Sequence, residues 1–191
     1  MNTTSTAYES ALRPLSLVLS AVPAEAWATP SPCTEWTVRD VVAHMIDTQR
    51  SLLTDHGHDL GPAPDLTDPA TGFRDHAERV RSLMSSDEVV GAAYDGFFGP
   101  TTVGATLEQF YVWDMLVHRW DIARATGGDE VLTPAELDRI EAGADSFGAA
   151  LHIDGICGPA VPVPADADRQ TLLLSRLGRR ANPSDEREGG T

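Results

Sequence analysis

The chain has 191 residues and 41% hydrophobic residues, which suits one folded domain with a sizeable core and argues against wholesale disorder. Its formal net charge of −15 argues against nucleic acids and anionic membrane surfaces as partners. The sequence does not open with a basic, then apolar leader, and no apolar run approaches the roughly 18 residues of a membrane span, so we expect a cytoplasmic protein.

Apolar residues recur at helical spacing in five segments. The predicted helices are residues 6–22, 37–57, 73–86, 105–126 and 133–151. Pro14 lies inside the first of them, and we expect that helix to begin or kink there, because proline cannot donate an intrahelical hydrogen bond. Thr37 with Asp40 three residues later resembles a capping box at the start of the second helix.

Loops rich in proline, glycine and small polar residues separate these helices. They cover residues 28–36, 57–72 and 96–104. Residues 158–180 begin extended, because alternating prolines exclude helix, and end in a short segment from Gln170 to Leu177. With little strand signal, the pattern predicts an all-α four-helix bundle with an additional helix and a short Pro-rich C-terminal extension. We expect one helical domain over residues 1–180 and a disordered tail over 181–191.

The fourth predicted helix carries a polar pair within an apolar stripe. Asp114 and His118 are four residues apart, so their Cβ atoms should lie about 5–6 Å apart on one helix face. A carboxylate and an imidazole in a bundle core are common ligands of a divalent metal. Two ligands rarely suffice, and His44 on the second helix is the candidate third. Asp121, one turn beyond His118, could hold the other ring nitrogen of that histidine or be a surface acid.

The other histidines offer weaker cases for a ligand. His56 and His58 fall in a turn, where we expect them to be solvated, and His76 lies in a charged run that indicates a surface face. On spacing alone, a helical Asp-x-x-x-His pair is more often a hydrogen-bonded buried network than a metal site. The residue pattern therefore leaves both interpretations open.

Two longer motifs resemble a known family. The stretch PCTEWTVRDVVAHMID, residues 32–47, resembles the first signature of the DinB-like superfamily branch that includes mycothiol-dependent maleylpyruvate isomerase. The stretch DMLVHRWDIARATG, residues 114–127, resembles the second signature. The segment 158–180 also looks like the C-terminal end of an actinobacterial family in that branch. The resemblance spans roughly residues 5 to 180, with both motifs in the expected order and spacing.

The resemblance implies a DinB-like four-helix bundle that holds a divalent metal, usually zinc or nickel. The ligands it implies are His44 from the first motif and Asp114 and His118 from the second. Asp114 stands where the isomerase has Glu, which shortens the reach of the carboxylate by one methylene. The resemblance also implies a metal-dependent transferase or isomerase with mycothiol, a low-molecular-weight thiol, as cosubstrate.

Several other residues are candidates for the lining of a substrate site. They are Trp36, Tyr111, Trp120 and Arg124. Packing is the competing interpretation for the two tryptophans, and a solvated position near the helix C-terminus is the competing one for Arg124. Cys33 has no cationic neighbour in sequence to lower the pKa of its thiol, so we expect an inert packing role.

Two alternative functions stay open at this point. Two histidines and one carboxylate also describe the non-haem iron site of oxygen-activating enzymes. A non-catalytic helical binding protein with a buried Asp-His polar network is the other alternative. The expected partners are a small-molecule substrate and a small thiol, with no nucleic acid or membrane, and a homodimer is compatible with the sequence.

Overall fold

The computed structural model describes residues 2–153 and 155–180, which form two compact units. The first unit extends to Glu130 and the second begins at Val131. The helical domain predicted over residues 1–180 spans both units, and its extent as one domain stays a prediction. The predicted tail, 181–191, lies outside the described residues.

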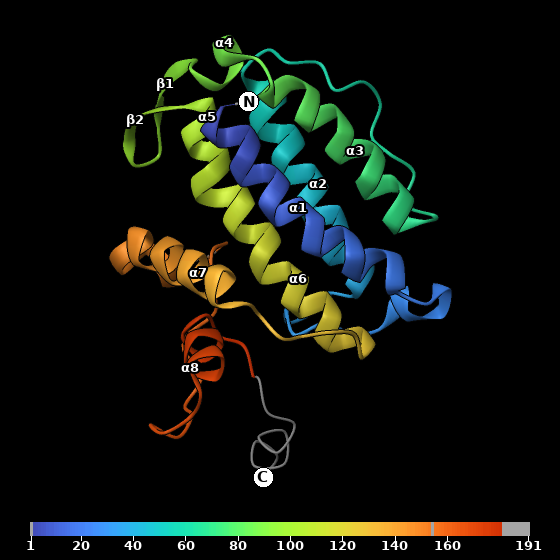
Figure 1. The fold of residues 1–191 in the computed structure, drawn as a ribbon, viewed down its shortest axis with the longest axis vertical. Helices are drawn as coiled ribbons and strands as arrows, with labels where there is room; N and C mark the ends of the chain where they lie inside the picture. Colours follow the sequence, from blue (N-terminus) through green and yellow to red (C-terminus); the bar gives the residue numbers. More distant parts are fainter. Residues whose placement is uncertain (1, 154, 181–191) are drawn as a thin grey trace. The chain divides into compact units, whose positions relative to one another are not determined.

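The first unit contains a bundle of four long helices. These are α1 (Thr3–Ala21), α2 (Val38–Asp55), α3 (Pro69–Met84) and α6 (Trp113–Thr126). Figure 1 shows them running side by side, and α1 and α2 each contact both α3 and α6. The apolar faces of the helices meet in the middle of the bundle, where side chains such as Leu15, Met45 and Phe73 are fully buried. The predicted all-α fold is confirmed.

Local capping explains where two of these helices begin. Thr37 and Asp40 form the expected capping box at the start of α2, with the Thr37 N–H donating to the Asp40 carboxylate at 2.9 Å. The side chain of Asn2 caps α1 by accepting from the Ser5 N–H, so this helix begins earlier than predicted. Pro14 lies inside α1, so the prediction that the helix begins there is wrong, while the alternative of a kink stays a prediction. Packing of α1 against both α3 and α6 offsets the one hydrogen bond that Pro14 removes.

A short hairpin precedes the last bundle helix. Strand β1 (Ala93–Gly96) pairs antiparallel with β2 (Gly99–Thr102), and the short helix α4 (Asp87–Val90) comes directly before them. A 3-10 turn, η1 (Ala24–Ala28), lies earlier in the chain, between α1 and α2. The prediction of a plain loop over residues 96–104 is wrong here. Each strand has only four residues, too few for an alternating pattern, and Gly99 takes a φ of 105°, which side chains disfavour.

The predicted helix over residues 105–126 contains a π-helical turn. The chain passes from α5 (Val103–Thr106) through the π turn η2 (Leu107–Val112) into α6. A π turn holds more residues per turn than an α-helix, so it changes which side chains before and after it share a face. Such turns occur frequently at functional sites, and this one ends directly before the helix that carries Asp114 and His118.

The second unit is small and helical. It consists of α7 (Pro134–Phe147), the 3-10 turn η3 (Gly148–His152) and α8 (Arg169–Arg176). A second capping box, formed by Thr133 and Glu136, begins α7. Arg169 on α8 forms an ion pair with Asp138 on α7 at 2.8 Å. Across both units, no helix of the described residues has the length and apolar character that a bilayer crossing requires.

His76 is buried in the bundle, against the prediction of a surface position. Its side chain is 1% exposed, and its Nε2 lies 3.2 Å from Gln49 Oε1, which also accepts a hydrogen bond from the Tyr8 hydroxyl at 3.0 Å. Burial, followed by the charges of Arg50 and Arg79, lowers the pKa of His76 to about 4. His76 is therefore a neutral core residue at pH 7.

This burial predicts an acid-sensitive fold. Because folding lowers the pKa of His76 from about 6.5 to about 4, its neutral form contributes stability above pH 6.5 that is lost as the pH falls toward 4. The shift corresponds to roughly 3 kcal/mol. We expect urea unfolding of metal-free protein to show a smaller loss of stability between pH 7 and pH 4 in His76→Gln than in wild type. His58→Gln is the matched control and should lose as much stability between pH 7 and pH 4 as wild type. The same loss in His76→Gln as in wild type would contradict this role of His76.

Candidate metal centre

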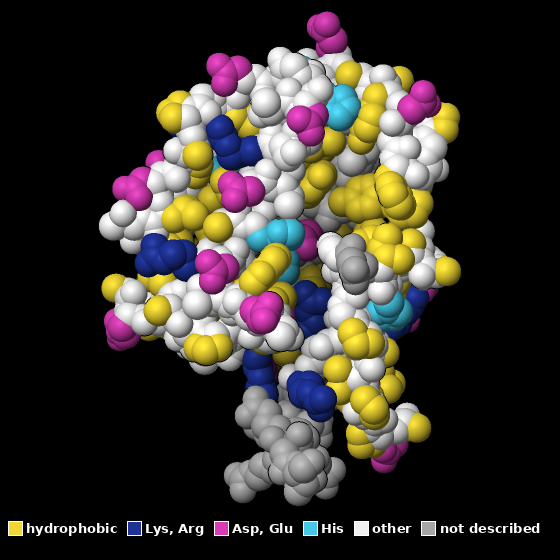
Figure 2. Space-filling view, turned by 180° about the vertical axis from the view of Figure 1, so that it is seen from behind, with side chains coloured by type: hydrophobic (Ala, Val, Ile, Leu, Met, Phe, Trp, Pro, Cys, Tyr) yellow, Lys and Arg dark blue, Asp and Glu magenta, His cyan; other side chains and the backbone are white. Residues whose placement is uncertain are grey.

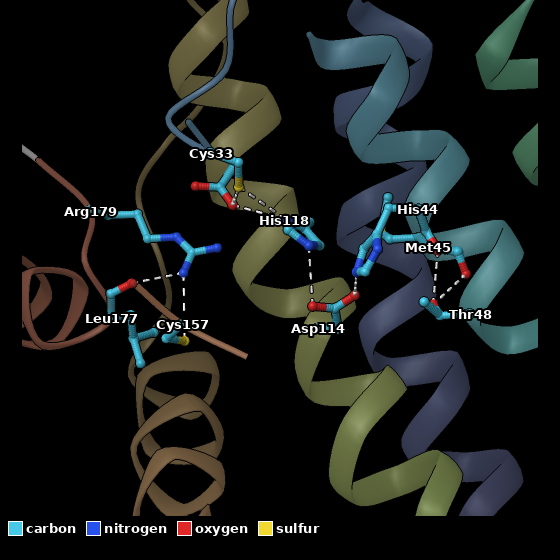
Figure 3. Close-up of polar contacts among 10 residues, drawn as sticks. Cys33, His44, Met45, Thr48, Asp114, His118, Cys157, Leu177 and Arg179 are labelled. Atoms are coloured by element: carbon cyan, nitrogen blue, oxygen red, sulfur yellow. Dashed lines mark hydrogen bonds and ion pairs between the residues drawn. The ribbon is translucent and has the colours of Figure 1, made fainter. Parts of the chain in front are cut away.

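Three side chains from two bundle helices converge at one point. Figure 3 shows His44 from α2 and His118 from α6 pointing toward the carboxylate of Asp114. His44 Nε2 lies 3.3 Å from Asp114 Oδ2, and His118 Nε2 lies 3.1 Å from Asp114 Oδ1. One ligand atom from each residue lies within 4.8 Å of the other two. The contact between α2 and α6 therefore brings together the three residues that the sequence proposed as a ligand set.

The other side of the His118 ring is held by buried polar groups. Its Nδ1 lies 2.8 Å from Asp121 Oδ2, and the Asp121 side chain is fully buried. The Cys33 thiol also donates to Asp121 Oδ2, at 3.3 Å, and its sulfur lies 3.9 Å from His118 Nδ1. Asp121 is thus not a surface acid, and Cys33 has a polar contact in addition to the packing role expected for it.

A tight loop carries Cys33 and Trp36 to this position. The Trp36 N–H donates to the Cys33 carbonyl at 3.0 Å, and the Ser31 N–H donates to the Trp36 carbonyl at 2.8 Å. Glu35 has a φ of 69°, in the left-handed region that non-glycine residues rarely adopt. Such strained residues cluster at binding and catalytic sites, where the surrounding contacts hold them in place.

Trp36 packs directly on the two histidines. Its ring centroid lies 4.7 Å from that of His44 and 6.4 Å from that of His118. The two imidazoles are themselves 5.4 Å apart and nearly perpendicular, at 83°. The indole therefore packs against both imidazoles, and its role in lining a substrate site stays a prediction.

The charges of this cluster support one another. Burial opposes ionisation of Asp114, but the charges and hydrogen bonds of His118 and His44 outweigh it and hold the pKa of Asp114 well below its usual range. Burial also opposes a charged His118, but the Asp114 charge and the hydrogen bonds of the ring with Asp114, Asp121 and Cys33 raise the pKa of His118 well above its usual range. A cation is therefore favoured between these carboxylates.

The donor set fits a divalent metal ion. Two imidazole nitrogens and one carboxylate are the ligands that catalytic zinc sites use, and imidazole also suits nickel and iron. The His44 and Asp114 side chains are 28% and 20% exposed, whereas His118 is 4% exposed, so the cluster is open on one side only. This partial access would leave coordination positions for a substrate or water.

The remaining candidates lie in different surroundings. Trp120 is fully buried, as packing in the core requires, and its part in a substrate site stays a prediction. Arg124 forms an ion pair with Glu130 at 3.2 Å. Tyr111 is half-buried in the π turn, three residues before Asp114. His56 is not simply solvated, because its ring packs against Tyr94 with centroids 4.1 Å apart.

Comparison with known proteins places this geometry in a family context. The chain is 26% identical over 188 residues to the uncharacterised protein Rv0738 of Mycobacterium tuberculosis strain H37Rv, an alignment that covers 91% of this chain and 96% of that protein. It is also 25% identical over 169 residues to the uncharacterised protein Rv0036c of the same strain, covering 78% of this chain and 66% of that protein. No solved structure matches the chain.

The family assignment rests on the bundle itself. Residues 8–123 match the family described as the mycothiol maleylpyruvate isomerase N-terminal domain. The matched range runs from Tyr8 in α1 to Ala123 in α6, with His44, Asp114 and His118 inside it. The match covers more than half of the chain and includes the first motif and the second one as far as Ala123. The chain belongs to the mycothiol maleylpyruvate isomerase N-terminal domain family.

Proposed function

We propose that the protein is a divalent-metal-dependent enzyme that uses a small thiol, such as mycothiol, to transfer a group or to isomerise an electrophilic substrate. The convergence of His44, Asp114 and His118 is the observation that carries the proposal. Zinc or nickel suits these ligands. The family's description names mycothiol and maleylpyruvate, which makes a low-molecular-weight thiol the first cosubstrate to test.

Each of the three proposed ligands would bind the ion through a different atom. His44 and His118 each present Nε2 to the same point, and Asp114 presents its carboxylate between them. A divalent ion bound there supplies charge that lowers the pKa of a coordinated thiol and polarises a substrate carbonyl. The partly exposed His44 and Asp114 mark the side from which thiol and substrate would enter.

Groups behind the ligands would set their orientation. With its Nδ1–H donated to Asp121, His118 would present Nε2 to an ion bound beside Asp114 and His44. Trp36 covers the rings and keeps water from one side of the cluster. In an isomerisation, the thiolate adds to a conjugated carbon–carbon double bond, the resulting single bond rotates, and expulsion of the thiolate restores the double bond. That sequence consumes no oxidant or reductant.

Replacement of Asp121 should weaken metal binding through His118. In Asp121→Asn, the neutral amide no longer holds the Nδ1 proton with a full negative charge, so the imidazole becomes a poorer ligand. We expect zinc affinity to fall about 10–100-fold, as is usual when such a partner of a ligating histidine is lost. Isothermal titration of zinc into both proteins measures the difference. Unchanged affinity would remove Asp121 from this role and leave the three ligands in place.

The enzymatic part of the proposal has a direct test. Metal-loaded protein is mixed with mycothiol and, in turn, with maleylpyruvate and a panel of unsaturated ketones, and both the free thiol and the cis–trans state of the double bond are followed. We expect wild type to catalyse isomerisation or thiol consumption with at least one of these electrophiles, and His118→Ala and metal-stripped protein to do neither. A fully metal-loaded wild type that is inactive with mycothiol, maleylpyruvate and a panel of unsaturated ketones would overturn the proposed thiol chemistry.

The non-catalytic alternative makes the opposite prediction. The hydrogen bonds of His44 and His118 to Asp114 already satisfy these side chains without an ion, as in a structural polar network. Such a network would give a stable protein that takes up no zinc, nickel or iron. Activation of oxygen by iron-loaded protein, without need for a thiol, would instead favour the non-haem iron alternative.

A further inference from the structure

A pocket in the first unit is lined by the helical segment that leads into the candidate metal centre. Its volume is about 470 Å³, within the range of small-molecule sites. The end of α2, the β1–β2 hairpin and the π turn η2 form its walls. Tyr111 belongs to this wall and lies three residues before Asp114 on the continuous helical segment.

Aromatic side chains dominate the pocket walls. Phe98 from the hairpin stacks on Phe110 from the π turn, with ring centroids 5.9 Å apart and an interplanar angle of 11°. Phe97 packs edge-on against Phe98 at 4.9 Å. Phe97 and Phe98 are 83% and 50% exposed, so a large apolar surface stays in contact with water. Where the hairpin lies, Figure 2 shows large hydrophobic side chains at the surface with histidine and acidic side chains nearby.

The polar groups of the pocket are largely paired with one another. The Tyr94 hydroxyl lies 2.6 Å from Thr106 Oγ1, and the Ser51 hydroxyl donates to Asp55 at 3.2 Å. Among the described residues that line the pocket, none is a lysine or an arginine, while Asp55 is an acid. A carboxylate-bearing ligand would therefore meet the like charge of Asp55 and no lysine or arginine; His56, the imidazole of the described lining, has its Nδ1 2.7 Å from the Leu52 carbonyl.

Tyr111 links this pocket to the metal ligands. Burial is the largest cause that raises the pKa of its phenol, and Tyr94, Asp114 and Asp55 raise it further. Tyr94 and Asp55 line the pocket, whereas Asp114 is a proposed ligand. Tyr111 thus lines the pocket and, three residues before Asp114, shares a helix face with that proposed ligand.

We propose that this pocket binds the electrophilic substrate and that the substrate carries an uncharged aromatic group. That the bound compound is a substrate rests on the function proposed above, whereas binding of an aromatic compound in the pocket does not depend on a metal. The aromatic stack, the exposed phenylalanines and the absence of cationic side chains from the described lining select a flat, neutral group over a dicarboxylate such as maleylpyruvate.

Binding of two probes of equal ring size tests this inference. Equilibrium dialysis at pH 7 compares neutral 2-naphthol with anionic 2-naphthoate, using metal-stripped and metal-loaded protein. We expect naphthol to bind both forms of the protein and naphthoate to bind metal-stripped protein at least about tenfold more weakly, because its charge must be desolvated beside Asp55. Equal binding of the two probes to metal-stripped protein, or no binding of naphthol, would overturn the proposal.

Variants locate the bound probe. Phe98→Ala and Phe110→Ala remove the two stacked rings and should each weaken naphthol binding about tenfold, whereas Leu17→Ala, which removes an exposed side chain on α1, should leave it unchanged. Because Phe98 is exposed, its replacement does not open the core. Unaltered binding in both phenylalanine variants would place the probe elsewhere and overturn the proposal.

The same samples separate this inference from its alternatives. Naphthol binding without any metal uptake would refute the proposed enzyme and retain the pocket, whereas metal- and thiol-dependent activity without naphthol binding would refute the pocket alone. Light scattering at the dialysis concentration detects self-association. A dimer that Phe97→Ala disrupts and that blocks naphthol would identify the exposed phenylalanines as a contact between copies and overturn the proposal.

Discussion

His118→Ala should lower the affinity of the protein for zinc and nickel by more than about 100-fold, beyond the loss usual for a residue that only supports a ligand. His118 is the most buried of the three converging residues and lies close to both Asp114 and Asp121. Its removal leaves only His44 and Asp114, which cannot enclose an ion. A titration in which a metal-sensitive dye competes with the protein for the ion measures this loss of affinity.

Two further sets of variants make this result specific. His44→Ala changes a partly exposed side chain, so it should lose metal with less risk to the fold than the buried His118. His56→Ala and His58→Ala should bind as wild type, because neither belongs to the two groups of possible ligands in the described residues. If the His58 and His118 variants lost equal metal affinity while circular dichroism showed intact helices, the metal would not bind at His44, Asp114 and His118.

The stabilisation by metal should shrink as the solution becomes acidic. Protons compete with the ion for histidine, and the raised pKa of His118 means that this competition begins above the usual histidine value of about 6.5. Affinity should fall about tenfold per pH unit for each proton that the metal must displace. Asp114 adds little to this dependence, because its lowered pKa keeps the carboxylate ionised throughout the range.

In the metal-free protein, the contribution of His118 to stability should increase as the solution becomes acidic, opposite to the stabilisation by metal. Since folding raises the pKa of His118, its charged form stabilises the apo fold fully below about pH 6.5, and that contribution is lost as the pH rises through the folded value. The gap in melting temperature between loaded and stripped samples should therefore widen from pH 5 to pH 8. A gap that stays constant over this range would argue against histidine ligands.

Local sequence patterns predicted the helical bundle and the pairing of two of the three proposed ligands, Asp114 and His118. The capping box at Thr37 and the Asp114–His118 pair depend only on residues three or four positions apart, so helical spacing sufficed to predict them. The approach of His44 depends on how α2 packs on α6, which spacing within one helix does not determine. The periodic helix around His44 made it the candidate third ligand, and its position in the family motif then made it an implied one.

Other features depend on structure that the sequence patterns did not reveal. Cys33 reaches Asp121 across 88 positions of the chain by way of a strained loop, and no local rule predicts such a contact. The π turn that carries Tyr111 is indistinguishable from α-helix by apolar spacing. For His76 a signal was present: it shares an apolar face with Phe73 and Val80, but the neighbouring charges suggested a surface position.

The metal content of the native protein tests the central claim most directly. Protein produced without a histidine tag, and purified without added metal or chelator, is analysed by inductively coupled plasma mass spectrometry and then titrated with zinc, nickel and iron. We expect about one divalent ion per chain, bound by His44, Asp114 and His118 and absent from the His44→Ala variant. Protein that is isolated free of metal and binds none of the three ions on titration would contradict the proposed metal centre.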